Sequence, residues 1–272
     1  MTNLSITRLK FTALVLSTLM MVLPSANADS IGSITYLGNE GILLSNGDQK
    51  VLFDPFFHNV YGQYQAVPEE IQQAIKNNTP PYDDIDLIVI SHAHGDHFTA
   101  ETVADYLSAN ENVFLVAPSQ ASKTVTELTA ELNDQIISVE LNFGDAPVFN
   151  EVKNIAIESV RIPHAGWPER KDIANLVHRV TLNNGVRIIH MGDADPRDEH
   201  FKPFANLWDS KTSDISFPPY WFFVSEEGPT ILKERINSKK SIGVHVPVDV
   251  PQALKDSGAE YFSLPGTKLD LP

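Results

Sequence analysis

The sequence predicts an α/β fold in which two β-sheets lie between layers of helices. Short apolar runs separated by turn residues fill the first part of the chain, strand-like and helix-like segments then alternate, and the same mixture returns toward the carboxyl end. Such segments pack as layers around apolar cores, so the repeated mixture favours two sheets with helices outside. No internal repeat of solenoid length and no low-complexity linker is present, so we expect residues 29–272 to form a single domain.

The first predicted elements are strands. Residues 33–37, 41–45 and 51–54 are short apolar runs, and Asn46-Gly47-Asp48 between the last two is a strong hairpin signal. The run 86–90, Asp-Leu-Ile-Val-Ile, is typical of a strand that is buried on both faces.

Residues 55–83, between these strands, predict an insertion that contains one helix. Pro68 is favoured in the first turn of a helix, and Ile71 and Ile75 lie four residues apart, which gives the helix one apolar face.

From residue 99 onward, helices and strands alternate. Thr99 and Ser119 are expected to cap helices that run to about Ala109 and Leu132, because a side-chain oxygen at that position satisfies free backbone N–H groups. A further helix is expected around 230–238, and the remaining predicted strands are 113–117, 136–140, 155–162, 175–182, 186–190, 215–217 and 241–245.

Residues 1–28 have the pattern of a secretory signal peptide. Arg8 and Lys10 form a basic start, residues 11–23 are apolar but short for a membrane span, and an Ala-Asn-Ala cleavage pattern ends at Ala28. We therefore expect a periplasmic or secreted protein without stable membrane association after cleavage. The alternative is an uncleaved N-terminal anchor.

The chain is acidic and contains no cysteine. Its formal net charge is −15, and the signal peptide removes two basic and no acidic residues. This charge argues against nucleic acid or an anionic membrane as the main partner, since both attract Lys/Arg patches, and leaves a small-molecule substrate. Without cysteine there is no disulfide framework, and metal ligands must be His, Asp, Glu or weaker oxygen donors.

A loop rich in His and Asp follows the buried run 86–90. Segment 91–98 reads Ser-His-Ala-His-Gly-Asp-His-Phe. In α/β folds, the carboxyl end of a strand is the usual place for chemistry. Three imidazoles and a carboxylate are the donors that zinc and some other transition metals prefer. The alternative is a solvated loop that happens to be rich in His.

The spacing within this loop favours two metal positions. His92 and His94 are two residues apart in a tight turn, so both side chains can hold one ion. Gly95 lets the backbone reverse and directs Asp96 and His97 toward a second position.

Two ions need more ligands than this loop supplies, and three further candidates stand at the ends of predicted strands. They are His164, Asp193 and His245. Each is weak alone, but together they complete two sites of three or four protein ligands. Asp195 is an alternative to Asp193, although Gly192-Asp193 is the better motif.

The remaining histidines have other expected roles. His190 and His178 lie on predicted strands and are expected to be structural or to support the site. His58 and His200 lie in predicted loops and are expected to be solvated, with His58 able to edge the site.

The candidate residues follow one another along the chain as Asp54, the loop 91–98, His164, Asp193 and His245. Motifs in this order resemble those of the metallo-β-lactamase superfamily, and the resemblance covers most of residues 31–265. The resemblance implies a four-layer αββα sandwich with a dinuclear metal site along one edge of the sheets. It implies that Asp54 orients the His loop and that Asp193 bridges two ions, the first held by His92, His94 and His164 and the second by Asp96, His97 and His245.

The chemistry expected from this resemblance is hydrolysis. Two divalent ions would activate water for attack on a phosphodiester, lactone or similar ester bond. Zinc is the expected metal, with manganese or iron as alternatives. Asp96 would also orient the nucleophile or relay a proton. The alternatives are a mononuclear-iron dioxygenase acting on sulfur compounds and a metal-binding protein without turnover.

Residues 36–41 and 51–55 look most like the branch that contains ascorbate-phosphate lactonases and phosphodiester-cleaving phospholipases. That branch often has a Gly-His pair where this chain has Gly38-Asn39-Glu40, which leaves the substrate open. Asn39 and Glu40 either line the site or only make the turn.

Two aromatic segments have open roles as well. Residues 56–64 and 220–223 either form a lid over the metals or cap the core.

Overall fold

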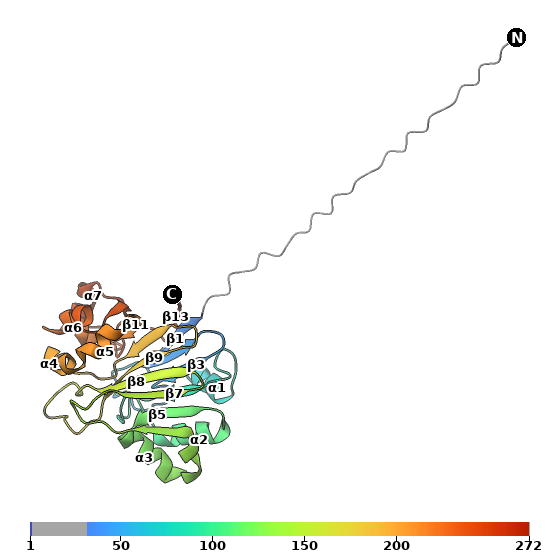
Figure 1. Ribbon diagram of the computed structural model, residues 1–272, viewed down its shortest axis with the longest axis horizontal. Helices are drawn as coiled ribbons and strands as arrows, with labels where there is room; N and C mark the ends of the chain where they lie inside the picture. Colours follow the sequence, from blue (N-terminus) through green and yellow to red (C-terminus); the bar gives the residue numbers. More distant parts are fainter. Residues whose placement is uncertain (2–31, 272) are drawn as a thin grey trace.

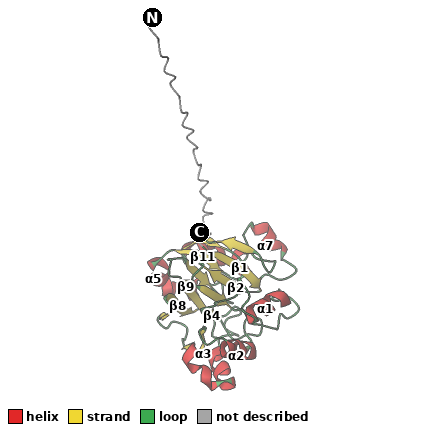
Figure 2. Ribbon diagram, turned by 90° about the vertical axis from the view of Figure 1, so that its right-hand side faces the viewer, coloured by secondary structure: helices red, strands yellow, loops and turns green. Residues whose placement is uncertain are grey.

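The structure is a computed structural model that describes Met1 and residues 32–271, and it confirms the predicted α/β sandwich (Figure 1). Apart from Met1, the expected signal peptide at 1–28 lies outside the described residues. Figure 2 shows the strands of the two sheets lying between helices. None of the described helices has the length and apolarity that a membrane-spanning helix requires.

The first sheet has seven strands in the order β13-β1-β2-β3-β4-β5-β6. Neighbouring strands from β13 to β3 are antiparallel, and those from β3 to β6 are parallel. The strands are β1 (Ser33–Gly38), β2 (Gly41–Ser45), β3 (Lys50–Phe53), β4 (Leu87–Val89), β5 (Phe114–Pro118), β6 (Ile136–Val139) and β13 (Lys268–Asp270).

The second sheet has six strands in the order β12-β11-β10-β9-β8-β7. The pairs from β10 to β12 are parallel and the others antiparallel. The strands are β7 (Val148–Val152), β8 (Ile155–Arg161), β9 (Leu176–Thr181), β10 (Arg187–His190), β11 (Ser213–Phe217) and β12 (Ser238–Ser241).

Helices cover the outer face of each sheet. Figure 1 shows α2 and α3 on one side of the sandwich and α4, α5 and α6 on the other. The α-helices are α1 (Glu69–Lys76), α2 (Ala100–Ala109), α3 (Ser119–Leu128), α4 (Asp198–Phe201), α5 (Ala205–Ser210), α6 (Gly228–Glu234) and α7 (Gln252–Ser257). Short 3-10 helices are η1 (Ala130–Gln135), η2 (Lys202–Phe204) and η3 (Tyr220–Phe223).

Alternation along the strands creates three apolar layers. In β4, Leu87 and Val89 point into the core between the sheets, whereas Ile88 points to the helices α2 and α3. In β9, Val180 faces the core between the sheets and Val177 packs under α4 to α6. Successive side chains of a strand point to opposite faces, so strands buried on both sides read as continuous apolar runs.

The topology gathers strand ends at one edge of the sandwich. The strands β3 and β4 run parallel, and β8, β10, β11 and β12 share one direction in the second sheet because β9 is antiparallel to both of its neighbours. The loops that leave these strands therefore meet at their carboxyl ends, which is where the predicted ligands lie.

Three predicted boundaries were wrong. Ser119 is the first residue of α3 rather than its cap, and this helix ends at Leu128 before the separate η1. The helix expected around 230–238 is α6 and ends earlier, at Glu234. The strand expected at 241–245 is instead the polar edge strand β12, which ends at Ser241, and charged residues suit an edge because they discourage pairing with another chain.

Candidate metal centre

Four loops bring the seven predicted ligands together. The loop after β4 carries His92, His94, Asp96 and His97, and the others follow β8, β10 and β12. The ligand atoms fall into two groups, and within each group all atoms lie within 4.8 Å of one another. The groups are His92, His94, His164 and Asp193, and Asp96, His97 and His245.

The first group is formed by three imidazole nitrogens and one carboxylate oxygen. His94 Nδ1 lies 3.1 Å from both His92 Nε2 and His164 Nε2. Asp193 Oδ2 lies 3.1 Å from His164 Nε2 and 3.9 Å from His92 Nε2. Three imidazoles and a carboxylate are a donor set that suits zinc and several other transition metals.

The second group surrounds the other oxygen of Asp193. Asp193 Oδ1 lies 3.1 Å from His245 Nε2 and 3.3 Å from His97 Nε2. Asp96 Oδ2 lies 3.3 Å from His245 Nε2 and 3.7 Å from His97 Nε2. The two oxygens of Asp193 thus face different groups, as a bridging carboxylate requires.

Orphaned polar atoms show that the residues fit bound cations. His97 Nε2, His245 Nε2 and Asp193 Oδ1 are buried and have no hydrogen-bond partner among the described residues. Each such atom costs about 1–3 kcal/mol if it stays unsatisfied. All three atoms face the second group, and a cation held there would accept their lone pairs, so the burial and donor chemistry of that group fit a metal ion.

Three of the four buried ligand imidazoles have their far nitrogen in contact with the protein, whereas Nδ1 of the fourth, His245, has no hydrogen-bond partner among the described residues. His97 Nδ1 donates to Asp54 Oδ2 at 2.8 Å, and His164 Nδ1 donates to the carbonyl oxygen of Ala165 at 2.7 Å. His92 Nδ1 lies 3.0 Å from Ser91 Oγ. These contacts direct Nε2 of each ring into the site and fix the tautomer. Asp54 therefore lies where the family resemblance places it.

Asp54 also fixes the start of the ligand loop. Its Oδ1 accepts the backbone N–H of Ser91 at 2.8 Å, and its Oδ2 accepts the Ser91 hydroxyl group. Glu40, Asp54 and His97 form a third group of clustered ligand atoms, but the Asp54 carboxylate is already engaged by Ser91 and His97. We therefore read Asp54 as an orienting residue.

Asn39 and Glu40 differ in how they meet the site. Asn39 Nδ2 donates to the carbonyl oxygen of Asp96 at 2.9 Å, and the Asn39 carbonyl accepts the N–H of His245 at 3.0 Å. Glu40 is fully buried behind the ligands, and its backbone oxygen lies 3.0 Å from His190 Nε2. Burial raises the pKa of Glu40 well above its usual range. Asn39 thus does more than make a turn, because it ties two ligand loops together.

Left-handed backbone conformations occur at three residues that belong to the site or support it. Asn39, Asp54 and His245 are not glycine, yet they have φ values of 43°, 38° and 55°. This left-handed conformation is uncommon for residues other than glycine, although Asn, Asp and His adopt it more readily than the rest, and it is often found at functional sites.

Asn175 supports the loop of Asp193 and was not foreseen from the sequence. Its Oδ1 accepts the N–H of Asp193 at 3.0 Å, and its Nδ2 donates to the carbonyl oxygen of Met191 at 3.2 Å. Gly192 has a φ of 52°, and a Cβ atom there would collide with Asn175 and Ser91. The signal for Asn175 was weak, since a polar residue at a strand start is common.

The charges of the site hold its groups in different protonation states. Burial lowers the pKa of His92 and His94, with neighbouring imidazoles adding to the effect. Burial also opposes charge on His97, but Asp193 and Asp54 outweigh it and hold the pKa of His97 well above its usual range. His245 and His97 likewise overcome burial and keep the pKa of Asp193 well below its usual range. Asp193 is therefore ionised, as a carboxylate that binds a cation must be.

Asp195 and His200 lie outside the ligand groups. Asp195 forms an ion pair with Arg197 at 2.7 Å and lies 3.4 Å from His200 Nε2. This geometry disfavours Asp195 as the alternative to Asp193. The expectation that His200 is solvated was wrong, because α4 buries it to 1% exposure beside the rings of Phe143 and Trp167.

The other two structural assignments agree with the geometry. His178 is buried between Ser159 Oγ at 2.9 Å and the carbonyl oxygen of Ile90 at 3.1 Å, so it joins the two sheets. His190 is buried and stacks on Phe53, with the ring centroids 5.1 Å apart.

A cavity of about 600 Å³ opens over the metal centre, and the aromatic segment 56–64 is divided between this cavity and the core. Phe56 and Phe57 are buried among the core residues under α1 and α2. Tyr64 packs edge-on against His245 with centroids 4.1 Å apart. The cavity is lined by Tyr61, Gln63, Tyr64, His94, Asp96, Glu169, Arg170, Asp172, Ile173, Asp193 and His245.

The second aromatic segment, 220–223, is also divided. Trp221 lies 5.2 Å from His245 between ring centroids, and its Nε1 donates to the carbonyl oxygen of Ala194 at 2.9 Å. Phe222 is fully buried in the core under α6. This segment therefore braces one ligand from behind, and it does not line the cavity over the metals.

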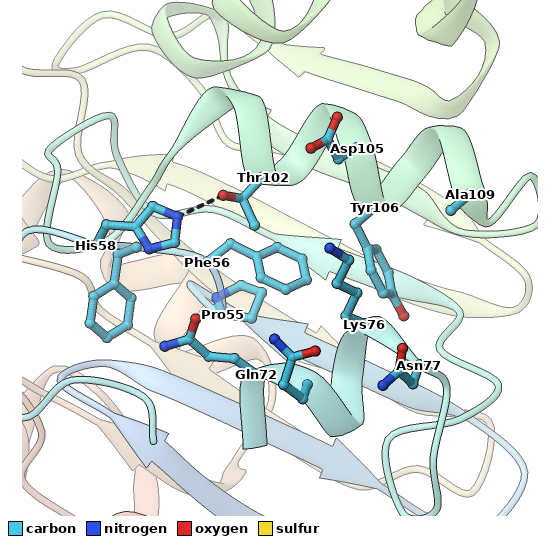
Figure 3. A pocket seen from close by; sticks show the side chains of 12 residues that line it. Pro55, Phe56, His58, Gln72, Lys76, Asn77, Thr102, Asp105, Tyr106 and Ala109 are labelled. Atoms are coloured by element: carbon cyan, nitrogen blue, oxygen red, sulfur yellow. Dashed lines mark hydrogen bonds between the residues drawn. The ribbon is translucent and has the colours of Figure 1, made fainter. Parts of the chain in front are cut away.

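A second cavity of about 380 Å³ lies between α1 and α2 and contains none of the ligands (Figure 3). Its wall includes Pro55 to His58, on the segment that continues to Tyr64. His58 is exposed, as expected, and its Nε2 lies 2.8 Å from Thr102 Oγ1. His58 therefore belongs to this second cavity and not to the metal centre.

Comparison with known proteins agrees with this geometry. Residues 33–207 match the family model described as the β-lactamase superfamily domain. A metal-dependent hydrolase of Pyrococcus abyssi is 27% identical over 162 residues, which are 59% of this chain and 60% of that protein. The N-acyl-phosphatidylethanolamine-hydrolyzing phospholipase D 1 of Caenorhabditis elegans is 22% identical over 233 residues, with 78% of this chain and 62% of that protein covered. The chain thus spans about 60% of the length of these relatives.

Solved structures share the fold at low identity. A metallo hydrolase of Ignicoccus hospitalis superimposes with a TM-score of 0.59 at 14% identity, covering 89% of this chain and 98% of the other. A diiron β-hydroxylase of Streptomyces venezuelae gives a TM-score of 0.53 at 11% identity, covering 88% of this chain and 54% of the other. At these identities the likeness shows the fold alone, and the fold accommodates different chemistries.

Proposed function

Because this chain belongs to the metallo-β-lactamase superfamily, we propose that it is a metal-dependent hydrolase that uses two divalent ions to cleave an ester-type bond, with zinc as the preferred metal. The observation that carries the proposal is the pair of ligand groups bridged by Asp193, whose two oxygens face His164 and His245. The names of the Pyrococcus and Caenorhabditis relatives support hydrolysis and, in the second case, cleavage of a phosphodiester.

Divalent cations in these groups would supply Lewis acidity, which lowers the pKa of water and polarises the bond to be cut. The chain's own residues prepare the site for this chemistry. Asp54 and Ala165 fix two imidazoles by hydrogen bonds, so little rearrangement is needed when ligands and substrate bind.

Asp96 combines two tasks in this proposal. Its carboxylate belongs to the second ligand group and also lines the cavity. Burial raises the pKa of Asp96, but His245 and His97 more than compensate and lower it. An ionised carboxylate at the cavity wall can accept a hydrogen bond from the attacking water and hold its lone pair toward the substrate.

The proposal includes export to the periplasm or the medium, which rests on the signal-peptide pattern at 1–28. Amino-terminal sequencing of the protein from culture fractions tests it. A mature start at Asp29 supports export, and an intact amino terminus in the cytoplasmic fraction contradicts it.

The function is tested by metal analysis together with a substrate panel. Purified protein is assayed with a phosphodiester, a lactone, a thioester and a β-lactam while zinc, manganese and iron are quantified. Zinc or manganese near two per chain, with turnover of the phosphodiester or the lactone, supports the proposal. One equivalent of iron with oxygen consumption on a sulfur compound would favour the dioxygenase alternative, and an inert metal-loaded protein would favour simple metal binding.

A further inference from the structure

A single cationic side chain lies on the wall of the cavity over the metal centre. Arg170 lines this cavity beside His94 and Asp193, and no Lys and no other Arg of the described residues does so. In a chain with net charge −15, a cation at this position calls for an explanation.

Arg170 also differs from the other arginines in its bonding. Every other arginine of the described chain donates hydrogen bonds through its guanidinium group, whereas Arg170 forms no such bond and no ion pair with a described residue. The bonded arginines are Arg161, Arg179, Arg187, Arg197 and Arg235. A guanidinium group has five N–H donors in a fixed fork, so an unbonded one beside a reaction site is available to a ligand.

The loop that carries Arg170 is held in place. The Arg170 N–H donates to the carbonyl oxygen of Gly166 at 3.2 Å, and the side chain lies over that glycine, two residues after His164. Gln120 clamps the far end of the loop, since its Nε2 donates to the Asp172 carbonyl at 2.6 Å and its Oε1 accepts the Ala174 N–H at 2.9 Å. These contacts hold the backbone of the loop, so the side chain of Arg170, an exposed residue, starts from a fixed place at the cavity wall while its guanidinium group stays free to meet a ligand.

Tyr64 adds a neutral donor to the same cavity. Its ring packs against His245, and its hydroxyl-bearing side chain lines the wall together with Arg170. A guanidinium group and a phenol near a metal pair are donors for an oxygen anion, and charge-assisted bonds of this kind are the stronger ones.

We propose that Arg170 and Tyr64 form a subsite for an oxyanionic group of the substrate, such as the phosphate of a phosphodiester or a carboxylate next to the scissile ester. The inference rests on the proposed function and narrows its substrate class from esters in general to anionic esters. Glu169 and Asp172 lie on the same wall and repel an anion, so Arg170 supplies the local attraction.

The test compares three chromogenic esters with one leaving group: bis(p-nitrophenyl) phosphate, p-nitrophenyl succinate and neutral p-nitrophenyl acetate. Arg170→Gln is expected to raise KM for the anionic substrate that the enzyme prefers by about 10- to 100-fold, the range for a lost charged hydrogen bond. The change in kcat should be smaller, KM for the acetate should stay within about twofold, and Arg170→Lys should restore part of the loss. The ester whose KM rises more in Arg170→Gln, the succinate or the phosphate, shows whether a carboxylate or a phosphate is bound.

Lys171→Gln is the matched control. This substitution removes the same charge at the next position in the chain. The Lys171 side chain, however, lines a different surface depression, together with Phe143 and Trp167. The substitution should change KM by less than about twofold at moderate salt. Asp172→Asn should shift KM for the anionic ester in the opposite direction from Arg170→Gln. Equal effects of the Arg170 and Lys171 variants, or an equal loss on the neutral ester, overturn the subsite.

A binding measurement separates this inference from the proposed function. Dimethyl phosphate is titrated calorimetrically into zinc-loaded wild-type protein and into the Arg170→Gln variant. If no ester is turned over but the variant binds dimethyl phosphate at least about tenfold more weakly, the hydrolase proposal fails and the anion subsite stands. Equal affinities overturn the subsite whether or not esters are hydrolysed.

Discussion

Two buried clusters of polar side chains are built in opposite ways, one on strands β8 and β9 of the second sheet and the other where loops from both sheets meet. Around Arg179, which is fully buried, the guanidinium group meets Glu158 at 2.6 and 2.9 Å and also donates to backbone carbonyls and a hydroxyl group. At the metal centre, His97, His245 and Asp193 leave buried atoms without a protein partner. Burial costs desolvation free energy in both clusters. Only the cluster around Arg179 offsets this cost with hydrogen bonds and an ion pair within the chain.

The difference distinguishes buried polar groups that stabilise the fold from buried polar groups that bind a ligand. A buried group that is fully bonded within the protein stabilises one arrangement and offers nothing to a ligand. A buried group with a free lone pair is stable only if something outside the chain completes it, and nearby neutral nitrogens and carboxylates select a cation. Four changes should break or sharpen this contrast.

Removing a ligand should have the largest effect. Asp193→Ala and His94→Ala are expected to lower kcat/KM by at least about 10⁴-fold, more than 5 kcal/mol of transition-state stabilisation, because they dismantle the metal sites. The fold should remain, as judged by circular dichroism and cooperative unfolding. His58→Ala, an exposed histidine of the second cavity, is the control and should keep full activity. Undiminished turnover in Asp193→Ala would refute the two-metal account.

Breaking the bonded cluster should instead cost stability. Arg179→Met leaves the buried Glu158 with only the half-exposed Lys211, 3.2 Å away, as a partner, and is expected to lower the free energy of unfolding by about 3 kcal/mol in urea titrations. Activity per folded molecule should be unchanged. The double variant Arg179→Met/Glu158→Leu should recover much of the loss, and a double variant no more stable than the single one would contradict this reading.

A pH dependence should come from His178, which links the sheets. Burial lowers the pKa of His178 from its usual 6.5 to about 4. Below pH 6.5 the unfolded chain takes up a proton that the folded state excludes, so stability should fall as the pH drops from about 6.5 to about 4. The loss amounts to roughly 3 kcal/mol at 1.36 kcal/mol per pKa unit.

The measurement is urea unfolding of wild type and His178→Asn at several pH values. The difference between the two curves isolates His178 from the other titrating groups. The wild type should lose more stability than the variant over this range, and parallel curves would show that His178 does not contribute.

The smallest effect should come from Ser91, which connects Asp54 to the ligand loop. Ser91→Ala removes the hydroxyl group that Asp54 accepts, and zinc affinity should fall by about 10- to 100-fold, the range typical of residues that orient metal ligands. Competition with a fluorescent chelator measures this change. Ser122→Ala is a suitable control, because Ser122 bonds Ser138 away from the centre. Equal zinc affinities of wild type and Ser91→Ala would remove Ser91 from the account.

The sequence foretold best what depends on local patterns. The run 86–90 was recognised because a strand buried on both faces must be apolar throughout, and the ligand loop because four metal donors fall within six residues. The edge strand β12 was missed because its Ser-Lys-Lys-Ser sequence is polar and its pairing with β11 comes from the tertiary fold.

At the site, the supporting contacts were harder to foresee than the ligands. Asn175 and Arg170 are separated from the ligand loop by many residues, and single polar residues in loops carry little signal, whereas Tyr64 lies in the segment 56–64 that was considered as a lid. Asn39 was left between two readings, and only its bonds to Asp96 and His245 decide that it ties the ligand loops together. Such roles depend on which loops meet, which the order of residues alone does not state.

The central claim is a pair of metal ions bridged by one carboxylate, and metal stoichiometry tests it most directly. Metal-free protein is titrated with zinc by calorimetry, and bound zinc is then quantified in wild type and in Asp193→Ala. We predict two equivalents in the wild type and the loss of at least one in the variant. A wild type that binds a single equivalent, or an Asp193→Ala protein that keeps both, would contradict the account.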